Sequence, residues 1–142
     1  MIGGRKTVFA AAAFMLFTWV LAPIATYHEG TAINVESTVL REPFHDGDDL
    51  VYDWSGEIIR SCPIQIKRYF VDSKNVITSL TTITLPADDL GRKSVERRLP
   101  VPLRMAEGPA QYHAVEYPQC SLLQRLFRPS VAYPVVEFTA HR

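Results

Sequence analysis

This chain of 142 residues contains two cysteines, Cys62 and Cys120, which are its first candidates for covalent chemistry. In an oxidising compartment an isolated pair usually bonds, and closing a loop of this length stabilises a fold by about 4 kcal/mol in the chain-entropy treatment. Two buried thiols, or pairing with another chain, are the alternatives. The long spacing and the lack of a histidine near either cysteine in sequence disfavour a metal site. We therefore expect a Cys62–Cys120 disulfide.

The run His45-Asp46-Gly47-Asp48-Asp49 is the most suggestive acidic cluster. Carboxylates at alternate positions can bind Ca²⁺, which takes about six to eight oxygen ligands. Glu57 stands where the last ligand of a calcium loop would be, counting from Asp46. However, Leu50, Val51 and Trp54 occupy positions that belong to ligands and loop residues. A solvated turn before a strand is therefore the favoured interpretation.

The four histidines give no pattern of metal ligands or of a catalytic pair. They are His28, His45, His113 and His141. None stands in an H-x-x-x-H or similar spacing, and the sequence contains no G-x-S-x-G nucleophile motif. A Ser-His-Asp triad assembled in space by the fold is not excluded by the sequence. A catalytic Cys-His pair is excluded if both cysteines form a disulfide. We expect no enzyme activity, no metal and no cofactor.

Two stretches are candidate partner surfaces. The first is apolar and lies between Arg125 and Arg128; its members are Leu122, Leu123, Leu126 and Phe127. It would either cover one end of the folded domain or stay exposed for a protein partner or the membrane surface. The second is basic: Arg92, Lys93, Arg97 and Arg98. It could meet anionic head groups or an acidic partner, but the neighbouring Asp88, Asp89 and Glu96 favour one charged strand face.

An apolar segment, residues 7–26, would carry all of these groups out of the cytoplasm. Its twenty residues contain no formal charge, and as a helix they reach about 30 Å, the thickness of a bilayer hydrocarbon core. Arg5 and Lys6 precede the segment, and the next basic residue is Arg41. This asymmetry predicts a cytoplasmic N-terminus.

The predicted organisation has four parts. They are a cytoplasmic N-terminus, a transmembrane helix or uncleaved signal anchor, a linker and an extracytoplasmic domain, at residues 1–6, 7–26, 27–32 and 33–142. A cleaved signal peptide is the alternative, but Pro23-Ile24-Ala25 is a poor cleavage site. Both interpretations place residues 27–142 in the same compartment. We therefore expect the inner (cytoplasmic) membrane, with the C-terminal domain in the periplasm or outside the cell.

The charge of the exported part argues against a nucleic-acid partner. Without Arg5 and Lys6, 13 of the 15 basic residues remain against 15 acidic ones, which gives a net charge of −2. Nucleic-acid binding would call for a strongly basic face or groove. We therefore expect a protein partner and contact with the membrane.

Alternation of apolar and polar residues predicts about seven strands, at 33–39, 50–54, 57–71, 76–85, 95–99, 111–120 and 131–138. Ser55-Gly56 is a turn signal between the second and third. Residues 121–130 have helical spacing but are few. The pattern is typical of an all-β, two-layer antiparallel sandwich.

Three details favour an immunoglobulin-like sandwich. Cys62 lies on an early strand and Cys120 on a late one, as a bridge between the sheets requires, and Tyr112 begins the late strand just after a turn. Trp54 supplies a large core aromatic. Trp54 precedes the first cysteine rather than following it, so we predict a sandwich and not a true immunoglobulin domain.

Short segments along the chain carry a family resemblance. They are Gly47-Asp-Asp-Leu-Val-Tyr52, Cys62 in a long strand, Arg98-Leu-Pro-Val-Pro102, Gly108 to Tyr112, Tyr117-Pro-Gln-Cys120 and a closing strand with Phe138. The layout resembles small uncharacterised proteins of tailed phages, prophages and their bacterial hosts, which have one N-terminal membrane helix and one β-sandwich. The resemblance implies this fold and supplies no catalytic residues.

The sequence thus predicts a membrane-anchored extracytoplasmic module, an accessory or assembly subunit, that acts by protein–protein interaction. One alternative is a small stabilising subunit of a membrane complex, in contact through its helix, where Ala10 to Ala13 permit close packing. The other is a small hydrolase or metal-binding protein.

Overall fold

The computed structural model describes Met15, residues 31–41 and residues 48–141. Apart from Met15, the predicted membrane helix at residues 7–26 lies outside the described residues, as do residues 42–47. Within the described residues, no helix combines the length and apolar character needed to cross a membrane. The chain divides into two compact units, Met1–Gly30 and Thr31–Arg142.

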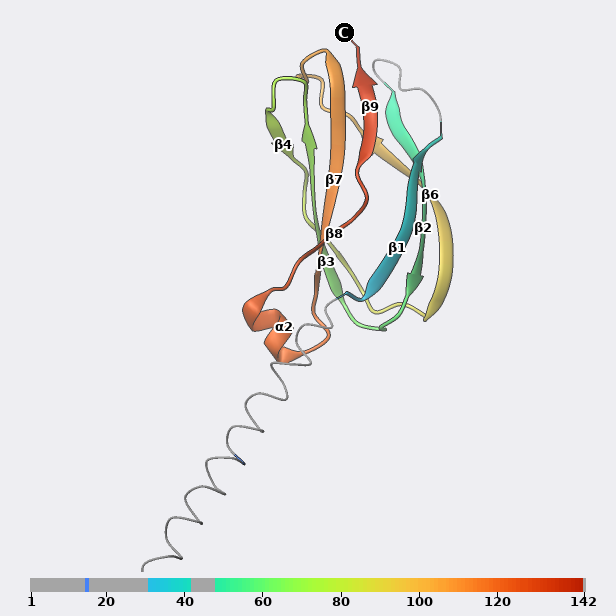
Figure 1. Cartoon of the computed structure of the whole chain (residues 1–142), viewed down its shortest axis with the longest axis vertical. Helices are drawn as coiled ribbons and strands as arrows, with labels where there is room; N and C mark the ends of the chain where they lie inside the picture. Colours follow the sequence, from blue (N-terminus) through green and yellow to red (C-terminus); the bar gives the residue numbers. More distant parts are fainter. Residues whose placement is uncertain (1–14, 16–30, 42–47, 142) are drawn as a thin grey trace, which may run out of the picture. The chain divides into compact units, whose positions relative to one another are not determined.

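This second unit consists of two antiparallel sheets (Figure 1). The first sheet has the order β1-β2-β6, with β1 (Ile33–Leu40), β2 (Asp49–Ile58) and β6 (Gly91–Pro100). The second sheet is centred on β3 (Ile64–Val71) and β7 (Gly108–Pro118). Four short strands flank that pair: β4 (Ile77–Ser79) and β5 (Ile83–Leu85) beside β3, β8 (Val131–Ala132) and β9 (Val136–Ala140) beside β7. The predicted all-β architecture is confirmed.

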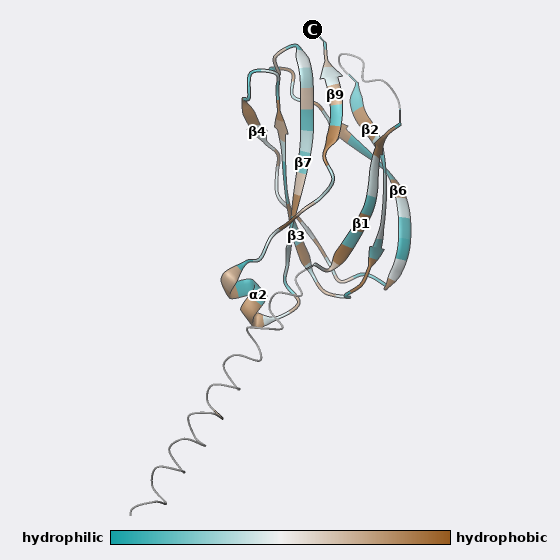
Figure 2. Cartoon of the chain, viewed as in Figure 1, coloured by the Kyte–Doolittle hydropathy of each residue, from teal (hydrophilic) through white to brown (hydrophobic). Residues whose placement is uncertain are grey.

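Strict alternation explains why the central strands form where they do. In β2, Leu50, Tyr52 and Trp54 are buried, while Asp49 before them and Asp53 between Tyr52 and Trp54 are exposed. The strand β7 alternates in the same way over eleven residues. Since side chains in a strand point to opposite faces in turn, this alternation gives one apolar face. Figure 2 shows hydrophobic and hydrophilic residues following one another along the strands. Packing these faces together forms the core.

Aromatic rings join the two sheets at the centre of the core. The Tyr52 ring of β2 lies 5.6 Å, centroid to centroid, from the Tyr112 ring of β7. Phe70 of β3 is fully buried and contacts both Tyr112 and Phe138. Burying a side chain of this size contributes about 1.5–3 kcal/mol. Tyr112 lies in the predicted late strand, with its ring in the core.

Two predicted strand boundaries are wrong. The expected turn at Ser55-Gly56 does not form, because β2 continues through both residues and pairs with β1 and β6 there. A Cβ added to Gly56 would lie 2.9 Å from the Asn34 carbonyl oxygen and 2.9 Å from Trp54 Cζ2. Glycine is required by this close packing and not by a turn. The predicted single strand 57–71 is instead divided, with Ile58 ending β2 and Ile64 beginning β3 in the other sheet.

Two other predicted strands are each split in two. The run 76–85 forms β4 and β5, which both pair with β3, and the run 131–138 forms β8 and the start of β9, which both pair with β7. Pro134 lies between β8 and β9, where it can donate no ladder hydrogen bond. For this reason residues 31–41 and 48–141 contain nine strands in place of about seven.

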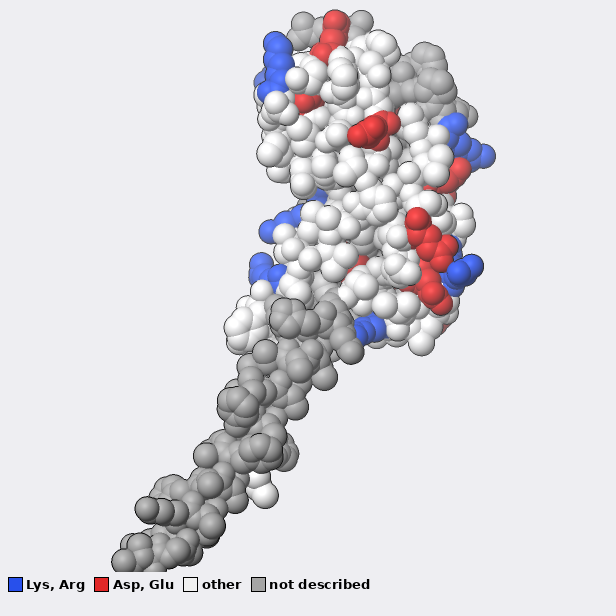
Figure 3. All heavy atoms as spheres, in the orientation of Figure 1, with Lys and Arg blue, Asp and Glu red and all other residues white. Residues whose placement is uncertain are grey.

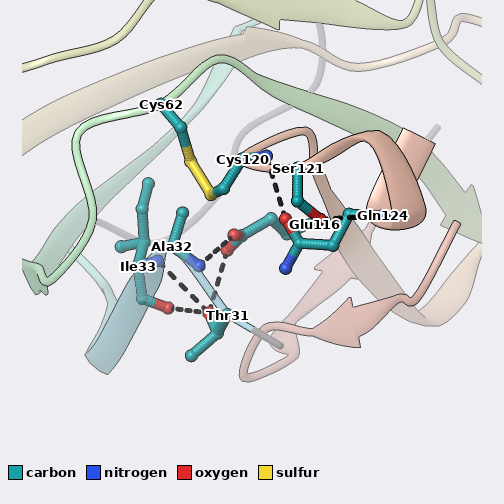
Figure 4. The surroundings of a disulfide bond; sticks show 8 residues. All are labelled: Thr31, Ala32, Ile33, Cys62, Glu116, Cys120, Ser121 and Gln124. Carbon is teal, nitrogen blue, oxygen red and sulfur yellow. Dashed lines mark hydrogen bonds between the residues drawn. A yellow bond between two sulfur atoms is a disulfide. The ribbon is translucent and has the colours of Figure 1, made fainter. Parts of the chain in front are cut away.

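Cys62 and Cys120 form the predicted disulfide, but it does not join the two sheets. Ile64 of β3 pairs with Pro118 of β7, and each cysteine lies two residues beyond that pair. The bridge therefore continues the β3–β7 pairing at one end of the second sheet, with the Cα atoms 5.0 Å apart (Figure 4). The prediction of an inter-sheet bridge was wrong because β3 and β7, although distant in sequence, are neighbours in one sheet.

Candidate functional site

On one side of the domain, the two sheets do not close over the core. A cleft of about 410 Å³ lies between β6 of the first sheet and β3 and β5 of the second. Its walls are mostly apolar and aromatic, with Trp54, Ile66, Ile83, Leu85 and Val95 among them. A second cavity of about 340 Å³ shares Ile33, Ile58, Leu85, Asp88 and Arg97 with it and extends to Cys62. We call this continuous space the inter-sheet cleft.

The strand β6 contributes charged side chains to the cleft. Lys93, Val95 and Arg97 pair in register with Gly56, Trp54 and Tyr52, which have the core-facing parity of β2. Two of the four predicted basic residues therefore face the inside of the sandwich. Arg92 and Arg98 have the opposite parity, although the Arg98 side chain also borders the cleft.

Most of the basic residues on β6 are neutralised locally. Lys93 Nζ lies 2.5 Å from Asp88, Arg98 Nε donates to Glu96 at 2.7 Å, and Arg92 lies 3.2 Å from Glu36. Glu96 also pairs with Arg41. Figure 3 shows basic and acidic groups side by side along this side of the domain. Exposed pairs of this kind contribute little stability.

Arg97 differs from these neighbours, since among the described residues it has no carboxylate partner. Its charge acts on the cleft phenols: it opposes the increase in pKa that burial causes at Tyr52 and Tyr133. Burial has the larger effect, so the pKa of each phenol is raised and both hydroxyls stay neutral. The cleft thus combines a positive charge with neutral hydroxyl groups.

Arg68 on β3 is the cleft residue that sequence reasoning missed. It has the core-facing parity of β3, which it shares with Ile66 and Phe70. Its Nη2 donates to the Thr81 carbonyl at 3.0 Å. Its Nε is buried and, in the described structure, has no hydrogen-bond partner. The available signal was a cation at a position whose neighbours of the same parity, Ile66 and Phe70, are apolar.

Glu116 lies near the disulfide and the residues that precede β1 (Figure 4). This fully buried carboxylate accepts hydrogen bonds from the Ala32 backbone N–H at 2.7 Å, the Tyr133 hydroxyl at 2.9 Å and the Thr31 hydroxyl at 3.3 Å. Burial raises the pKa of Glu116, and these hydrogen bonds oppose the increase. Its contacts are structural, because they tie the residues before β1 to β7.

The predicted apolar surface forms the short helix α2 (Leu122–Phe127). Ser121 caps its N-terminus through the Gln124 N–H, and the buried Gln124 side chain accepts from the Cys120 N–H at 2.9 Å. Leu122, Leu126 and Phe127 are 79%, 72% and 63% exposed, whereas Leu123 is half-buried. The helix lies beyond the end of β7 and away from β6, so the two predicted partner surfaces do not come together (Figure 1).

Other predicted positions contribute no assembled site. The acidic cluster at residues 45–49 falls partly outside the described residues, and Asp48 and Asp49 are exposed. His113 stacks on Tyr69 with ring centroids 4.9 Å apart. In the part of the chain that the structure describes, no three His, Cys, Asp or Glu side chains gather closely enough to hold a metal ion.

No protein-family model and no curated protein matches this chain. Among solved structures, it is similar to the Pseudomonas fluorescens alkylpurine DNA glycosylase AlkC bound to DNA containing an abasic site analog, with 10% sequence identity and a TM-score of 0.43. The alignment covers 79% of this chain and 31% of that chain. A likeness at this level carries no argument about fold family or function. The resemblance to phage and prophage membrane proteins stays a prediction.

Proposed function

We propose that this chain is a membrane-anchored, extracytoplasmic binding module that acts by protein–protein interaction, with residues 7–26 as its anchor and an immunoglobulin-like sandwich as its binding domain. Phage or prophage origin is part of the proposal and rests on the sequence resemblance. The observation that carries the interaction role is α2, a helix that is firmly attached and yet exposes large apolar side chains.

The helix is attached on one face and free on the other. The buried Gln124 side chain and the Ser121 cap fix its position beside the end of β7. The opposite face presents Leu122 and Leu126, each more than 70% exposed. Exposed apolar side chains on a backbone that is already held in place are typical of interaction surfaces, because the segment itself need not become ordered on binding.

The charges around α2 indicate the chemistry of the partner. Arg125 and Arg128 are exposed at the apolar face, and no acidic residue lies in the first turn of the helix. A complementary surface would be an apolar groove with an acidic rim. Complementary charges of this kind set orientation and association rate more than affinity.

Site-specific photo-crosslinking in intact cells tests the proposal. A photoreactive amino acid replaces Leu126, and in a matched control it replaces Leu103, which is 92% exposed in the loop before β7, at the opposite end of that strand. We expect a discrete protein adduct from position 126 and none of the same mass from position 103. Identical adducts from both positions, or none from position 126, would contradict the proposal.

A second experiment separates the proposal from its alternative, a stabilising subunit that uses its helix. Residues 7–26 are replaced by an unrelated spanning helix, and the crosslink at position 126 is measured again. Retention of the adduct supports binding through α2. Loss of the adduct with unchanged protein level would assign the main contact to the membrane segment.

A further inference from the structure

We propose that the inter-sheet cleft is a binding site for a small amphipathic anion, whose apolar body lies between the sheets and whose carboxylate or phosphate group meets Arg68 and Arg97. This site is separate from α2 and does not depend on the protein-binding role. It would make the domain a carrier or sensor of an acidic amphiphile.

The guanidinium of Arg68, with its buried Nε, points to an anionic ligand. Its Nε has no hydrogen-bond partner among the described residues, and buried donors in native proteins are nearly always satisfied. The side chain lines the cleft. An anionic oxygen in the cleft would accept from the guanidinium group in a charge-assisted hydrogen bond, which is about twice as strong as a neutral one.

Edge protection explains some of the cleft charges but not this one. Inward-pointing charges on an edge strand discourage pairing with other chains, and β6 is the edge of the first sheet. Lys93 and Arg97 fit that role. Arg68 does not, because β3 is an inner strand of the second sheet, paired with β7 on one side and with β4 and β5 on the other.

The balance of charge in the cleft also favours an anion. Asp88 is the one carboxylate that lines the described cleft, and Lys93 already pairs with it at 2.5 Å. Arg68 and Arg97 are therefore left without a carboxylate. Tyr112 adds a hydroxyl beside Arg68. This hydroxyl is neutral, because burial raises the pKa of Tyr112 far above the ordinary value. These groups can orient an acidic head group.

The remaining walls suit the apolar part of the ligand. Trp54, Ile66, Ile83 and Leu85 line the space, and about 410 Å³ lies within the usual range for small-molecule sites. Burial of each added methylene should increase affinity about fourfold, until the cleft is filled. A short-chain alkyl carboxylate is therefore a suitable probe.

The test uses the full chain in phosphatidylcholine nanodiscs. The sequence contains two tryptophans, Trp19 and Trp54. A Trp19→Phe variant keeps only Trp54, so tryptophan fluorescence then reports on the cleft. Octanoate and octyl phosphate are titrated, with neutral octanamide as control and empty nanodiscs to correct for partition into lipid. We expect saturable binding of an anion at least tenfold tighter than that of octanamide. The stronger of the two anions identifies the head group.

Arginine variants locate the anion. In the same background, Arg68→Gln and Arg97→Gln should each weaken anion binding about tenfold and leave octanamide unchanged. Arg92→Gln is the matched control, since Arg92 lies on the same strand with outward parity, and it should change affinity less than twofold. Arg97 is exposed, so its variant should fold even if Arg68→Gln does not. Lack of saturation with both anions, equal binding of octanamide, or an equal loss in Arg92→Gln would overturn the proposal.

Discussion

The Glu116 carboxylate accepts a hydrogen bond from the Ala32 backbone N–H at 2.7 Å, and this contact joins the residue before β1 to β7 of the other sheet. On its other side, the Ala32 carbonyl accepts from the Ile59 and Arg60 N–H groups, just beyond β2. Ala32 is therefore held by both sheets at once. The contact predicts how stability depends on pH.

Replacing Glu116 by Gln should remove a loss of folding stability that grows as pH rises. Burial raises the pKa of Glu116 above its ordinary value of 4.5, so the folded state holds the proton more tightly than the unfolded state. The contribution of Glu116 to stability is thus complete below pH 4.5 and declines as pH rises through the folded-state pKa. Urea unfolding should show Glu116→Gln gaining stability relative to wild type between pH 4.5 and pH 8. A constant difference would contradict this.

Glu116→Ala should lower the free energy of unfolding by about 2–4 kcal/mol, because it leaves buried donors unpaired.

Reduction of the disulfide should destabilise the domain without changing its sheet order. The bond closes a separation of 58 residues, which corresponds to about 4 kcal/mol in the chain-entropy treatment. Urea unfolding of oxidised and reduced protein measures the difference, and a Cys62→Ser/Cys120→Ser variant should match the reduced form. Thiol labelling of unfolded, unreduced protein should find no reactive cysteine. Two labelled sites would show that the bond is absent.

Gly56→Ala should destabilise the first sheet by about 1–3 kcal/mol, because overpacking forces neighbouring groups to move. The added methyl would meet the Asn34 carbonyl oxygen and the Trp54 ring, both at 2.9 Å. Ser94→Ala on β6 is a suitable control, since Ser94 is exposed and should change stability by less than about 0.5 kcal/mol. Denaturation midpoints for both variants test this. Equal midpoints for Gly56→Ala and wild type would show that the sheet adjusts freely.

Substitutions on the attached face of α2 should lower stability, whereas substitutions on its exposed face should affect only the proposed complex. Gln124→Ala removes the acceptor of the buried Cys120 N–H and should cost about 1–3 kcal/mol. Leu126→Asn acts on a side chain 72% exposed and should leave stability within about 0.5 kcal/mol. It should also abolish the adduct formed when the photoreactive amino acid replaces the neighbouring, 79% exposed Leu122. Thermal unfolding and crosslinking on the same two variants provide the comparison. A large loss of stability in Leu126→Asn would mean that its side chain packs on the domain.

Alternation in the sequence identified inward-facing residues more reliably than it identified sheets. Ile58 and Ile64 have the same parity and are both buried, as expected. Nothing in a two-residue period distinguishes a strand that continues from one that passes to the opposite sheet within residues 59–63. The same limit explains the disulfide: the cysteines were correctly paired, but their sheet could not be known before the β3–β7 pairing was seen.

The cleft was partly visible in the sequence. Arg97 shares its parity with Val95 and Leu99, which places a cation among apolar neighbours, but the neighbouring acidic residues favoured a single charged strand face. The openness of the sandwich was not visible, because it depends on how far β6 stands from β5. The exposure of α2 depended in the same way on tertiary packing: helical spacing at residues 122–127 predicts an apolar face but not whether another element covers it.

The attachment of Ala32 has a mechanical consequence. Tension arriving at the domain from residue 30 would reach Thr31 and Ala32 before any ladder hydrogen bond of β1. Glu116 passes that tension into β7, and the Cys62–Cys120 bond passes it on to the end of β3 covalently. The edge strand β1 is thereby spared from being peeled away from β2 one pair at a time. The domain is reinforced at the end where it would be pulled.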